Sequence, residues 1–176
     1  MRSSALLLII ALAGCSRAVQ RPDGNTGLLP VGAVAPDVVG ADVAHTEVRL
    51  SALKGRTAVV FFYPKDGTPG CTKEVCGFRE AWKRFQDANI GVIGVSADSA
   101  ARHQEWLEKE RLPFALASDE SGATALNYGV RTKLFGYERV TFLVGPDGRV
   151  AHVWPAVDPA QHFDEVLVAA AELAKK

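Results

Sequence analysis

The hydrophobic residues of this chain form two kinds of pattern. Continuous apolar runs rich in β-branched and aromatic residues occupy 57–63 and 90–96, which is typical of strands buried on both faces. Between these runs, apolar residues recur every three or four positions: Val75, Phe78, Trp82 and Phe85. This spacing predicts a helix with one face on the sheet.

The remaining pattern continues this alternation. The later predicted elements are a helix at 99–110, a strand at 113–117, a short helix to 128, a hairpin at 140–154 and a helix at 159–173. Ser99 and Asp158 stand where their side chains can cap two of these helices. Strands alternating with helices, followed by a hairpin and a helix, predict an α/β three-layer sandwich with a central mixed β-sheet.

The first residues are typical of a signal peptide. Arg2 is followed by a short apolar run at 5–13, roughly half of the ~20 residues that span a bilayer. The run ends in Leu12-Ala-Gly-Cys15, which resembles a bacterial lipoprotein box, in which the cysteine is lipidated. We therefore expect removal of residues 1–14 and anchoring through Cys15, with the protein facing the periplasm. Ser16 in place of aspartate favours the outer membrane; an ordinary cleaved signal or an uncleaved anchor is the alternative.

The segment after this cysteine differs from the rest of the chain. Residues 15–30 lack apolar periodicity and are rich in turn formers, which predicts a flexible tether and places the folded domain at 31–176. With 48% apolar and 23% charged residues, the 176-residue chain has the composition of one globular domain. Its formal net charge is zero and its basic residues are scattered, so it lacks the electrostatic footprint of a nucleic-acid-binding protein.

If Cys15 is lipidated, the chain has two cysteines left to react with each other, Cys71 and Cys76. One bridge closing so small a loop would constrain the unfolded chain little, so a structural disulfide is the weaker explanation. Cys71 follows a Pro- and Gly-rich loop and falls in the first turn of a predicted helix. Unpaired backbone N–H groups and the helix dipole favour a thiolate there, so Cys71 is the predicted nucleophile.

Ionisation alone does not make a cysteine a fast nucleophile. A free cysteine is about 3% thiolate at pH 7, so complete ionisation gains only ~30-fold. The remaining rate must come from groups that position the substrate and stabilise charge on the leaving group. Candidates are the Thr68 hydroxyl, the backbone amides of the loop, and a distant cation. The residues alone do not decide which arginine is that cation. The candidates are Arg131, Arg139 and Arg149.

Helix geometry separates the two cysteines. Five residues of helix give an axial separation of ~7.5 Å and an angular offset of about 140°. A disulfide needs Cα atoms within about 7 Å and facing Cβ vectors. We therefore expect a reduced state in which both cysteines are helical, and an oxidised state in which the first turns of the helix unwind.

The sequence from Phe61 to Arg79 resembles the peroxiredoxins of the bacterioferritin-comigratory, or Q, type. Its Pro64-x-x-x-Thr68-x-x-Cys71 core is similar to the peroxiredoxin active-site pattern, and a second cysteine five residues on is particular to this subgroup. The resemblance covers about 31–167.

This resemblance implies a thioredoxin-like fold and a thiol-dependent peroxidase for hydrogen peroxide and organic hydroperoxides. Cys71 would be the peroxidatic cysteine, and Cys76 would resolve its sulfenic acid as a disulfide that a thioredoxin-like dithiol reduces. Thr68 and Pro64 would form the active-site shell, and Arg139 would be the cation. We expect a monomer that needs no cofactor and no metal.

Two features depart from the family, and two other functions compete with it. Gly67 replaces a side chain that relatives often have, and an exported location leaves the electron donor open. A membrane-tethered copper carrier would favour C-x-x-x-C and a distal histidine, whereas this chain has C-x-x-x-x-C. A thiol–disulfide oxidoreductase would carry C-x-x-C. We expect surface or hydrogen-bonding roles for the four histidines, which lack metal-ligand spacing: His45, His103, His152 and His162.

Overall fold

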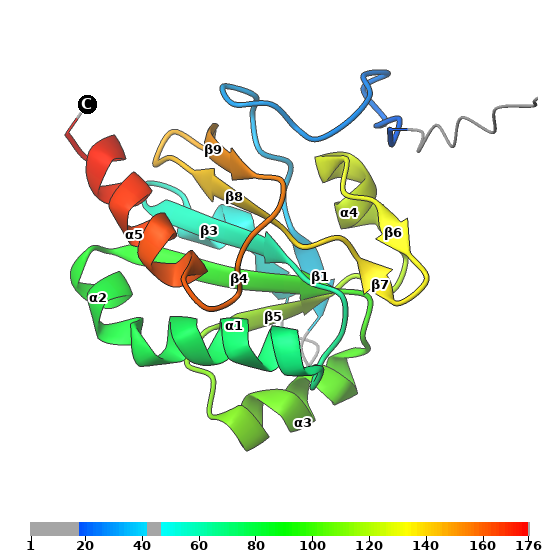
Figure 1. Ribbon diagram of the computed structural model, residues 1–176. Coiled ribbons are helices and arrows are strands. Elements are labelled where there is room, and N and C mark those ends of the chain that lie inside the picture. The colour runs from blue at the N-terminus through cyan, green and yellow to red at the C-terminus, as the bar shows by residue number, and fades with distance from the viewer. Residues whose placement is uncertain (1–17, 42–46, 176) are drawn as a thin grey trace, which may run out of the picture.

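The computed structural model describes residues 18–41 and 47–175, so the expected signal peptide, Cys15 and His45 lie outside the described residues. Within them, one sheet contains β1 (Val39–Ala41), β2 (Glu47–Arg49), β3 (Thr57–Phe62), β4 (Ile90–Ser96), β5 (Ala115–Ser118), β8 (Val140–Val144) and β9 (Val150–Trp154). The helices are η1 (Leu50–Leu53), α1 (Pro69–Glu80), α2 (Trp82–Asp87), α3 (Ala100–Glu110), α4 (Ala123–Tyr128) and α5 (His162–Leu173) (Figure 1). A small separate hairpin pairs β6 (Thr132–Lys133) with β7 (Gly136–Tyr137).

The sheet is mixed, with the strand order β2-β1-β5-β4-β3-β8-β9. β3, β4 and β5 are parallel, whereas β8 runs antiparallel to β3 and β9 antiparallel to β8. The central position of β3 explains its unbroken apolar sequence, because both edges of the strand are paired and both faces are covered.

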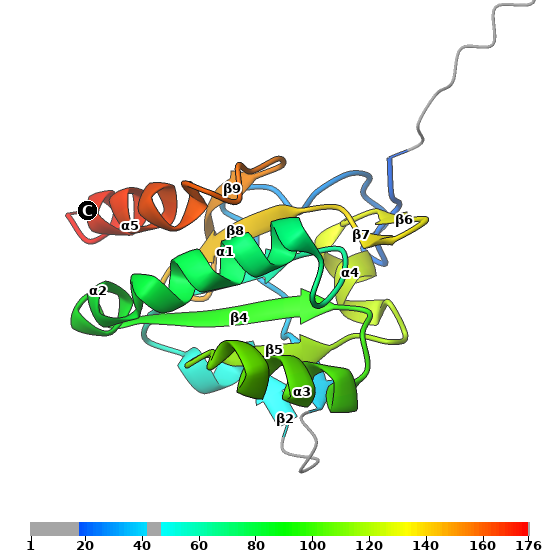
Figure 2. The ribbon, with the colours of Figure 1, turned by 60° about the horizontal axis from the view of Figure 1, so that its bottom comes forward.

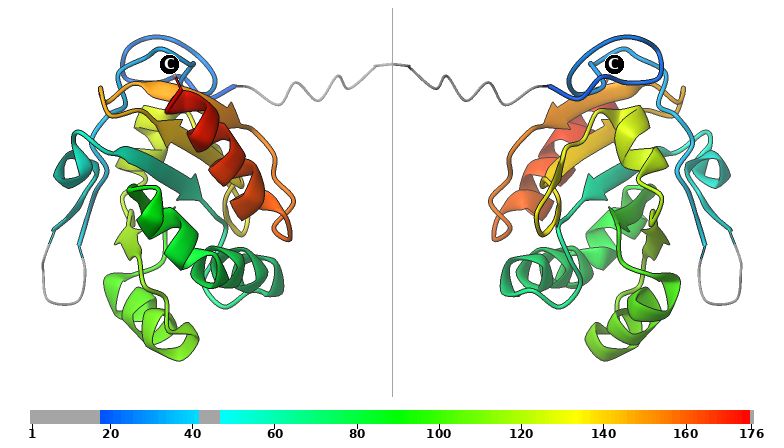
Figure 3. Two further views of the ribbon diagram at one scale, coloured as in Figure 1. Left: turned by 90° about the vertical axis from the view of Figure 1, so that its left-hand side faces the viewer. Right: turned by 90° about the vertical axis from the view of Figure 1, so that its right-hand side faces the viewer.

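Alternating side chains of β3 and of Tyr63, the residue after it, enter two different cores. Val59, Phe61 and Tyr63 face the core beneath α1, α2, α3 and α5. Val60 and Phe62 face the other core, which the N-terminal segment, η1 and α4 cover. Figure 2 shows α1 and α3 in front of β4 and β5, and Figure 3 shows the N-terminal segment and η1 on the side of the sheet opposite α5. The structure thus confirms the predicted three-layer α/β sandwich.

Element boundaries differ from the predictions at two helices. The long helix predicted after the cysteine loop is divided into α1 and α2 at Ala81, yet Phe78 and Phe85 stay in one core, so the apolar stripe is kept. The last helix begins at His162 rather than at 159. Asp158 instead caps the turn that comes before α5, because its carboxylate accepts a hydrogen bond of 2.9 Å from the Ala160 N–H.

Residues 18–30, which the sequence analysis assigned to a tether, form hydrogen bonds among themselves and pack against the domain. The Arg21 guanidinium donates to the carbonyl oxygens of Gly27 (2.7 Å) and Leu28 (3.0 Å), which closes a turn. Leu29 is buried in the core, and its N–H donates to the Tyr128 carbonyl at 3.0 Å. The packed domain therefore begins before the expected boundary at residue 31, because this segment covers one face of the sheet.

Within residues 18–41 and 47–175, no helix combines the length and the apolar character required to cross a membrane.

Candidate active site

The turn after β3 delivers Cys71 to the beginning of α1. Thr68 is the N-cap of this helix, with extended backbone angles, and Pro69 occupies its first position, where the missing N–H costs no helical hydrogen bond. Cys71 is therefore the third helical residue. Its side chain turns toward the sheet and is fully buried in the same core as Phe61 and Tyr63.

Arg139 supplies the cation beside this sulfur. Its Nη2 donates to Cys71 Sγ at 3.2 Å. Strand register explains the contact, because β8 pairs with β3 so that Val140 lies opposite Phe62, and the residue before Val140 reaches the turn into α1. The other two candidates lie elsewhere: Arg131 binds Glu138, and Arg149 donates to the Gly32 carbonyl.

Glu74 belongs to this site although the sequence analysis did not select it. The guanidinium of Arg139 is shared, with Nη1 paired to Glu74 Oε2 and Nη2 directed at Cys71 Sγ. Glu74 is 1% exposed, and its second oxygen, Oε1, has no hydrogen-bond partner. Burial raises the pKa of Glu74 to about 7, although the nearby Arg139 opposes the shift. Its position three residues after Cys71, on the same helix face, is a sequence pattern that could have identified it.

The raised pKa of Glu74 predicts a pH dependence of folding stability. The folded protein holds this proton more tightly than the unfolded chain, so the associated stability is present below the ordinary glutamate pKa and is lost as pH rises toward 7. In the reduced protein we expect the unfolding free energy to fall by roughly 2–3 kcal/mol across this window. Glu74→Gln should remove that slope in urea titrations at several pH values.

The matched control for this experiment is Glu80→Gln, because Glu80 lies on the same helix with an exposed side chain. That variant should keep the wild-type slope. Equal slopes in the wild type and in both variants would contradict a raised pKa for Glu74.

Thr68 and Pro64 both belong to the turn before Cys71, but neither side chain is hydrogen-bonded to the Cys71 sulfur. The Thr68 hydroxyl donates to the Lys65 carbonyl at 3.0 Å, so it stabilises the turn. The Pro64 carbonyl lies against Gly136 of β7, where a Cβ atom would come within 1.9 Å of that oxygen. Gly136 also has φ +107°, which favours glycine. The small hairpin therefore packs directly onto the turn that precedes Cys71.

Asp66 lies in the middle of this turn and is held there by four hydrogen bonds. Its carboxylate accepts hydrogen bonds from the Tyr63 hydroxyl (2.8 Å) and from His103 Nδ1 (2.7 Å). Its N–H donates to Asp98 at 2.8 Å, and its carbonyl accepts from Arg102 at 3.1 Å. Burial, together with the adjacent carboxylate, raises the pKa of Tyr63 well above its ordinary value. Asp66 and His103 are 37 residues apart, and no sequence pattern connects them.

The histidines agree in part with expectation. His103 and His162 are buried rather than exposed, but both are hydrogen-bonded, His103 to Asp66 and His162 to Thr141 at 2.7 Å. Burial lowers the pKa of His162, which favours a neutral ring. His152 is exposed, and its ring lies against that of Trp154 at a tilted angle, with the ring centroids 4.2 Å apart. In the described part of the chain, no group of three or more His, Cys, Asp or Glu residues is arranged to hold a metal ion.

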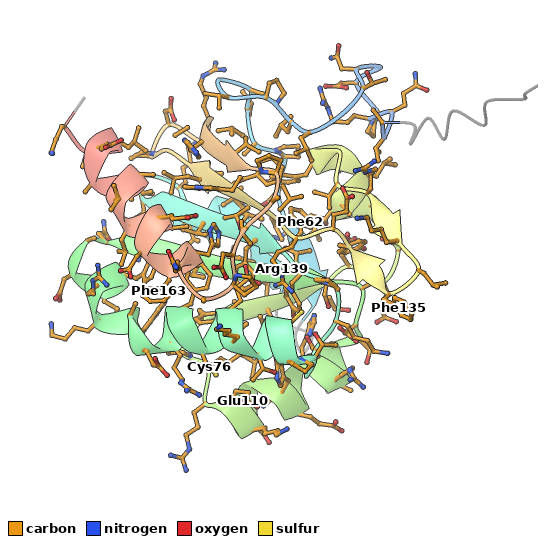
Figure 4. The ribbon with its side chains drawn as sticks, viewed as in Figure 1. Phe62, Cys76, Glu110, Phe135, Arg139 and Phe163 are labelled. Atoms are coloured by element: carbon orange, nitrogen blue, oxygen red, sulfur yellow. The ribbon has the colours of Figure 1, made fainter. Side chains whose placement is uncertain are left out.

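Cys76 lies on a different side of α1 from Cys71. It is half-buried, and its thiol donates to Glu110 Oε2 of α3 at 3.8 Å. Cys71 and Cys76 are both free thiols and both lie within α1, so the two-conformer prediction concerns a helix that contains both residues. Figure 4 shows Cys76 pointing down from α1 toward Glu110, whereas Arg139 lies above α1.

A buried sulfur at a helix N-terminus beside a guanidinium defines a class of protein that uses a cysteine nucleophile. Comparison with known proteins refines this class. Residues 31–153 match the model of the AhpC/TSA family. A relative from Coxiella burnetii, a bcp peroxiredoxin by its name, is 43% identical over 125 residues, which cover 67% of this chain and 83% of the relative. The chloroplastic peroxiredoxin Q of Sedum lineare is 39% identical over 139 residues, covering 77% and 75%.

Solved structures agree with these matches. The peroxiredoxin Q of Xanthomonas campestris superposes with a TM-score of 0.75 at 35% identity, covering 83% of this chain and 97% of that structure. The chain therefore belongs to the AhpC/TSA family and, within it, to the peroxiredoxin Q group. This assignment confirms the thioredoxin-like fold and the thiol-dependent peroxidase class. It does not favour a copper carrier.

Proposed function

We propose that Cys71 reduces hydrogen peroxide and organic hydroperoxides, that Cys76 resolves the product, and that a thioredoxin-like dithiol restores both thiols. The observation that carries this proposal is the 3.2 Å contact between Arg139 Nη2 and the buried Cys71 sulfur at the start of α1. This arrangement places a fixed positive charge beside the nucleophile. The charge is then close to the leaving oxygen when that oxygen becomes negative.

In the first step, the Cys71 thiolate attacks one peroxide oxygen. The sulfur–oxygen bond forms as the oxygen–oxygen bond breaks, and the leaving oxygen takes up a proton to become water or an alcohol. Arg139 stabilises the charge on both the sulfur and the leaving oxygen. The Thr68 hydroxyl already donates to the Lys65 carbonyl, so its oxygen is left to accept a hydrogen bond from the peroxide and orient it. Pro64 limits the access of water to the sulfur.

In the second step, the Cys76 sulfur attacks the Cys71 sulfenic acid. A disulfide forms, the sulfur–oxygen bond breaks, and the hydroxide leaves as water with the proton from the Cys76 thiol. Both cysteines lie within α1, so its first turns must unwind before the sulfurs can meet. An external dithiol then reduces the bridge and is itself oxidised to a disulfide. The monomer contains both cysteines, so this cycle needs no second copy of the chain.

One equivalent of hydrogen peroxide tests the assignment. Peptide mapping by mass spectrometry should show a Cys71–Cys76 disulfide in the wild-type protein. In Cys76→Ser, the oxidised product should be a Cys71 sulfenic acid that dimedone traps, and the same variant should accumulate a mixed disulfide with a thioredoxin-like donor whose second cysteine has been replaced by serine. A dominant disulfide between two protein molecules would refute intramolecular resolution.

We further propose that the enzyme is a lipoprotein anchored through Cys15 to the periplasmic side of the envelope, in the outer membrane. The Leu12-Ala-Gly-Cys15 sequence and the Ser16 that follows support this proposal. Metabolic labelling with a radioactive fatty acid should mark the wild-type protein and not Cys15→Ser. Equal labelling of the two proteins would contradict lipidation at Cys15.

A further inference from the structure

Three side chains join α1 to the end of α3 on the side of α1 that carries Cys76. The Cys76 thiol donates to Glu110 Oε2 at 3.8 Å. Arg79, one turn further along α1, donates from Nη1 to the Glu110 carbonyl oxygen at 2.5 Å and lies 4.0 Å from the same carboxylate oxygen. Glu110 is the last residue of α3, and its side chain is only 16% exposed. Figure 4 shows Cys76 and Glu110 between the two helices.

This contact also completes the end of α3. The last carbonyl groups of a helix lack partners within it and carry partial negative charge. Arg79 supplies a donor and a positive charge to one of them. Glu110 therefore binds α1 twice, through its main-chain carbonyl to Arg79 and through its carboxylate to Cys76.

The resolving step described above requires Cys76 to leave this position. We propose that Glu110 is a positioning residue for that step: it holds Cys76 and Arg79 against α3 while Cys71 reacts, and loss of these contacts sets how fast Cys76 reaches the sulfenic acid. The proposal rests on the proposed function, because it assigns Glu110 a place in the same cycle. The chemistry of the step is unchanged, and Glu110 neither touches the reacting sulfur of Cys71 nor supplies a co-reactant.

The charges around Cys76 make the contact sensitive to protonation. Burial raises the pKa of the Cys76 thiol, Arg79 lowers it, and the carboxylates of Glu110 and Glu80 raise it further. Lys109 pairs with the other oxygen of Glu110 at 3.8 Å. A neutral thiol can donate to Glu110, whereas a thiolate is repelled by it. The stabilisation of helical α1 is therefore present at pH values below the ordinary thiol pKa and is lost as pH rises through the raised value.

Glu110→Gln tests this role because it removes the charge and keeps the size of the side chain. In rapid-quench experiments with excess hydrogen peroxide, mass spectrometry follows the sulfenic acid and then the disulfide. We expect an unchanged rate of sulfenic acid formation and a roughly 3–10-fold faster conversion to the disulfide near pH 7. The ratio of variant to wild-type rates should approach one, or fall below it, at alkaline pH.

Glu105→Gln is the matched control, because Glu105 is an exposed carboxylate on the same helix, and its resolving rate should equal that of the wild type. Arg79→Gln, which weakens the contact with the Glu110 carbonyl, should also speed the resolving step. Slower resolution in Glu110→Gln would identify a base instead, and a pH-independent ratio of one would exclude any role; either result overturns the proposal. A wild-type protein that forms no sulfenic acid would instead refute the proposed function.

Discussion

Cys71→Ser is expected to lose all measurable peroxide reduction, down to the uncatalysed background. A serine hydroxyl is far less acidic than a thiol, and one guanidinium cannot make it an effective nucleophile toward a peroxide. Stopped-flow mixing with hydrogen peroxide should therefore detect no oxidation of this variant. Its fold should be kept, because the oxygen is smaller than the sulfur that it replaces in the core beneath α1.

The control for this result is Cys76→Ser, which keeps the nucleophile. That variant should consume one equivalent of peroxide at the wild-type rate and then stop in the absence of an external thiol. Peroxide consumption by folded Cys71→Ser at a rate comparable to the wild type would refute the assignment of the nucleophile.

Arg139→Gln is expected to have the second largest effect, a fall of roughly 10²–10³-fold in the second-order rate constant for peroxide. The amide keeps hydrogen-bonding capacity but removes the positive charge that lies 3.2 Å from the sulfur. It also leaves the buried Glu74 carboxylate without its counter-ion, which favours protonation of Glu74. Arg139→Lys should recover little of the rate, because a single ammonium cannot replace the two nitrogens that contact Cys71 and Glu74.

Arg131→Gln provides the matched comparison, because Arg131 lies immediately before β6 and binds Glu138 rather than the sulfur. Its peroxide rate should stay within about 2-fold of the wild type. The double variant Arg139→Gln/Glu74→Gln separates the effect of losing the positive charge near the sulfur from the effect on folding stability. It should regain stability relative to Arg139→Gln without regaining activity, and equal losses in Arg139→Gln and Arg131→Gln would exclude a specific role for Arg139.

The pattern of the sequence predicted the layers of the fold because burial leaves a direct trace in the order of apolar residues. The runs at 57–63 and 90–96 became β3 and β4, and the Ser99 cap is present, with its hydroxyl accepting from the Arg102 N–H. The packing of residues 18–30 was missed because a segment held by turns and one buried leucine has no periodicity.

The site was only partly predictable for a similar reason. The position of Cys71 followed from local helix signals, but Arg139 was selected through the family resemblance, since its contact depends on how β8 registers against β3. Asp66 and His103 meet only through the tertiary fold, as do Cys76 and Glu110. Such pairs of polar residues are set by packing between distant elements, and a single sequence contains no periodic record of them.

The early start of the packed domain bears on where this enzyme can act. Only three peptide units separate the proposed lipid attachment at Cys15 from Ala18, the first described residue, and the turn closed by Arg21 follows almost at once. Three extended residues reach at most ~11 Å. A lipidated form would therefore be confined to the immediate surface of the bilayer, where it would intercept peroxides that leave the lipid and would require a reductant able to approach that surface.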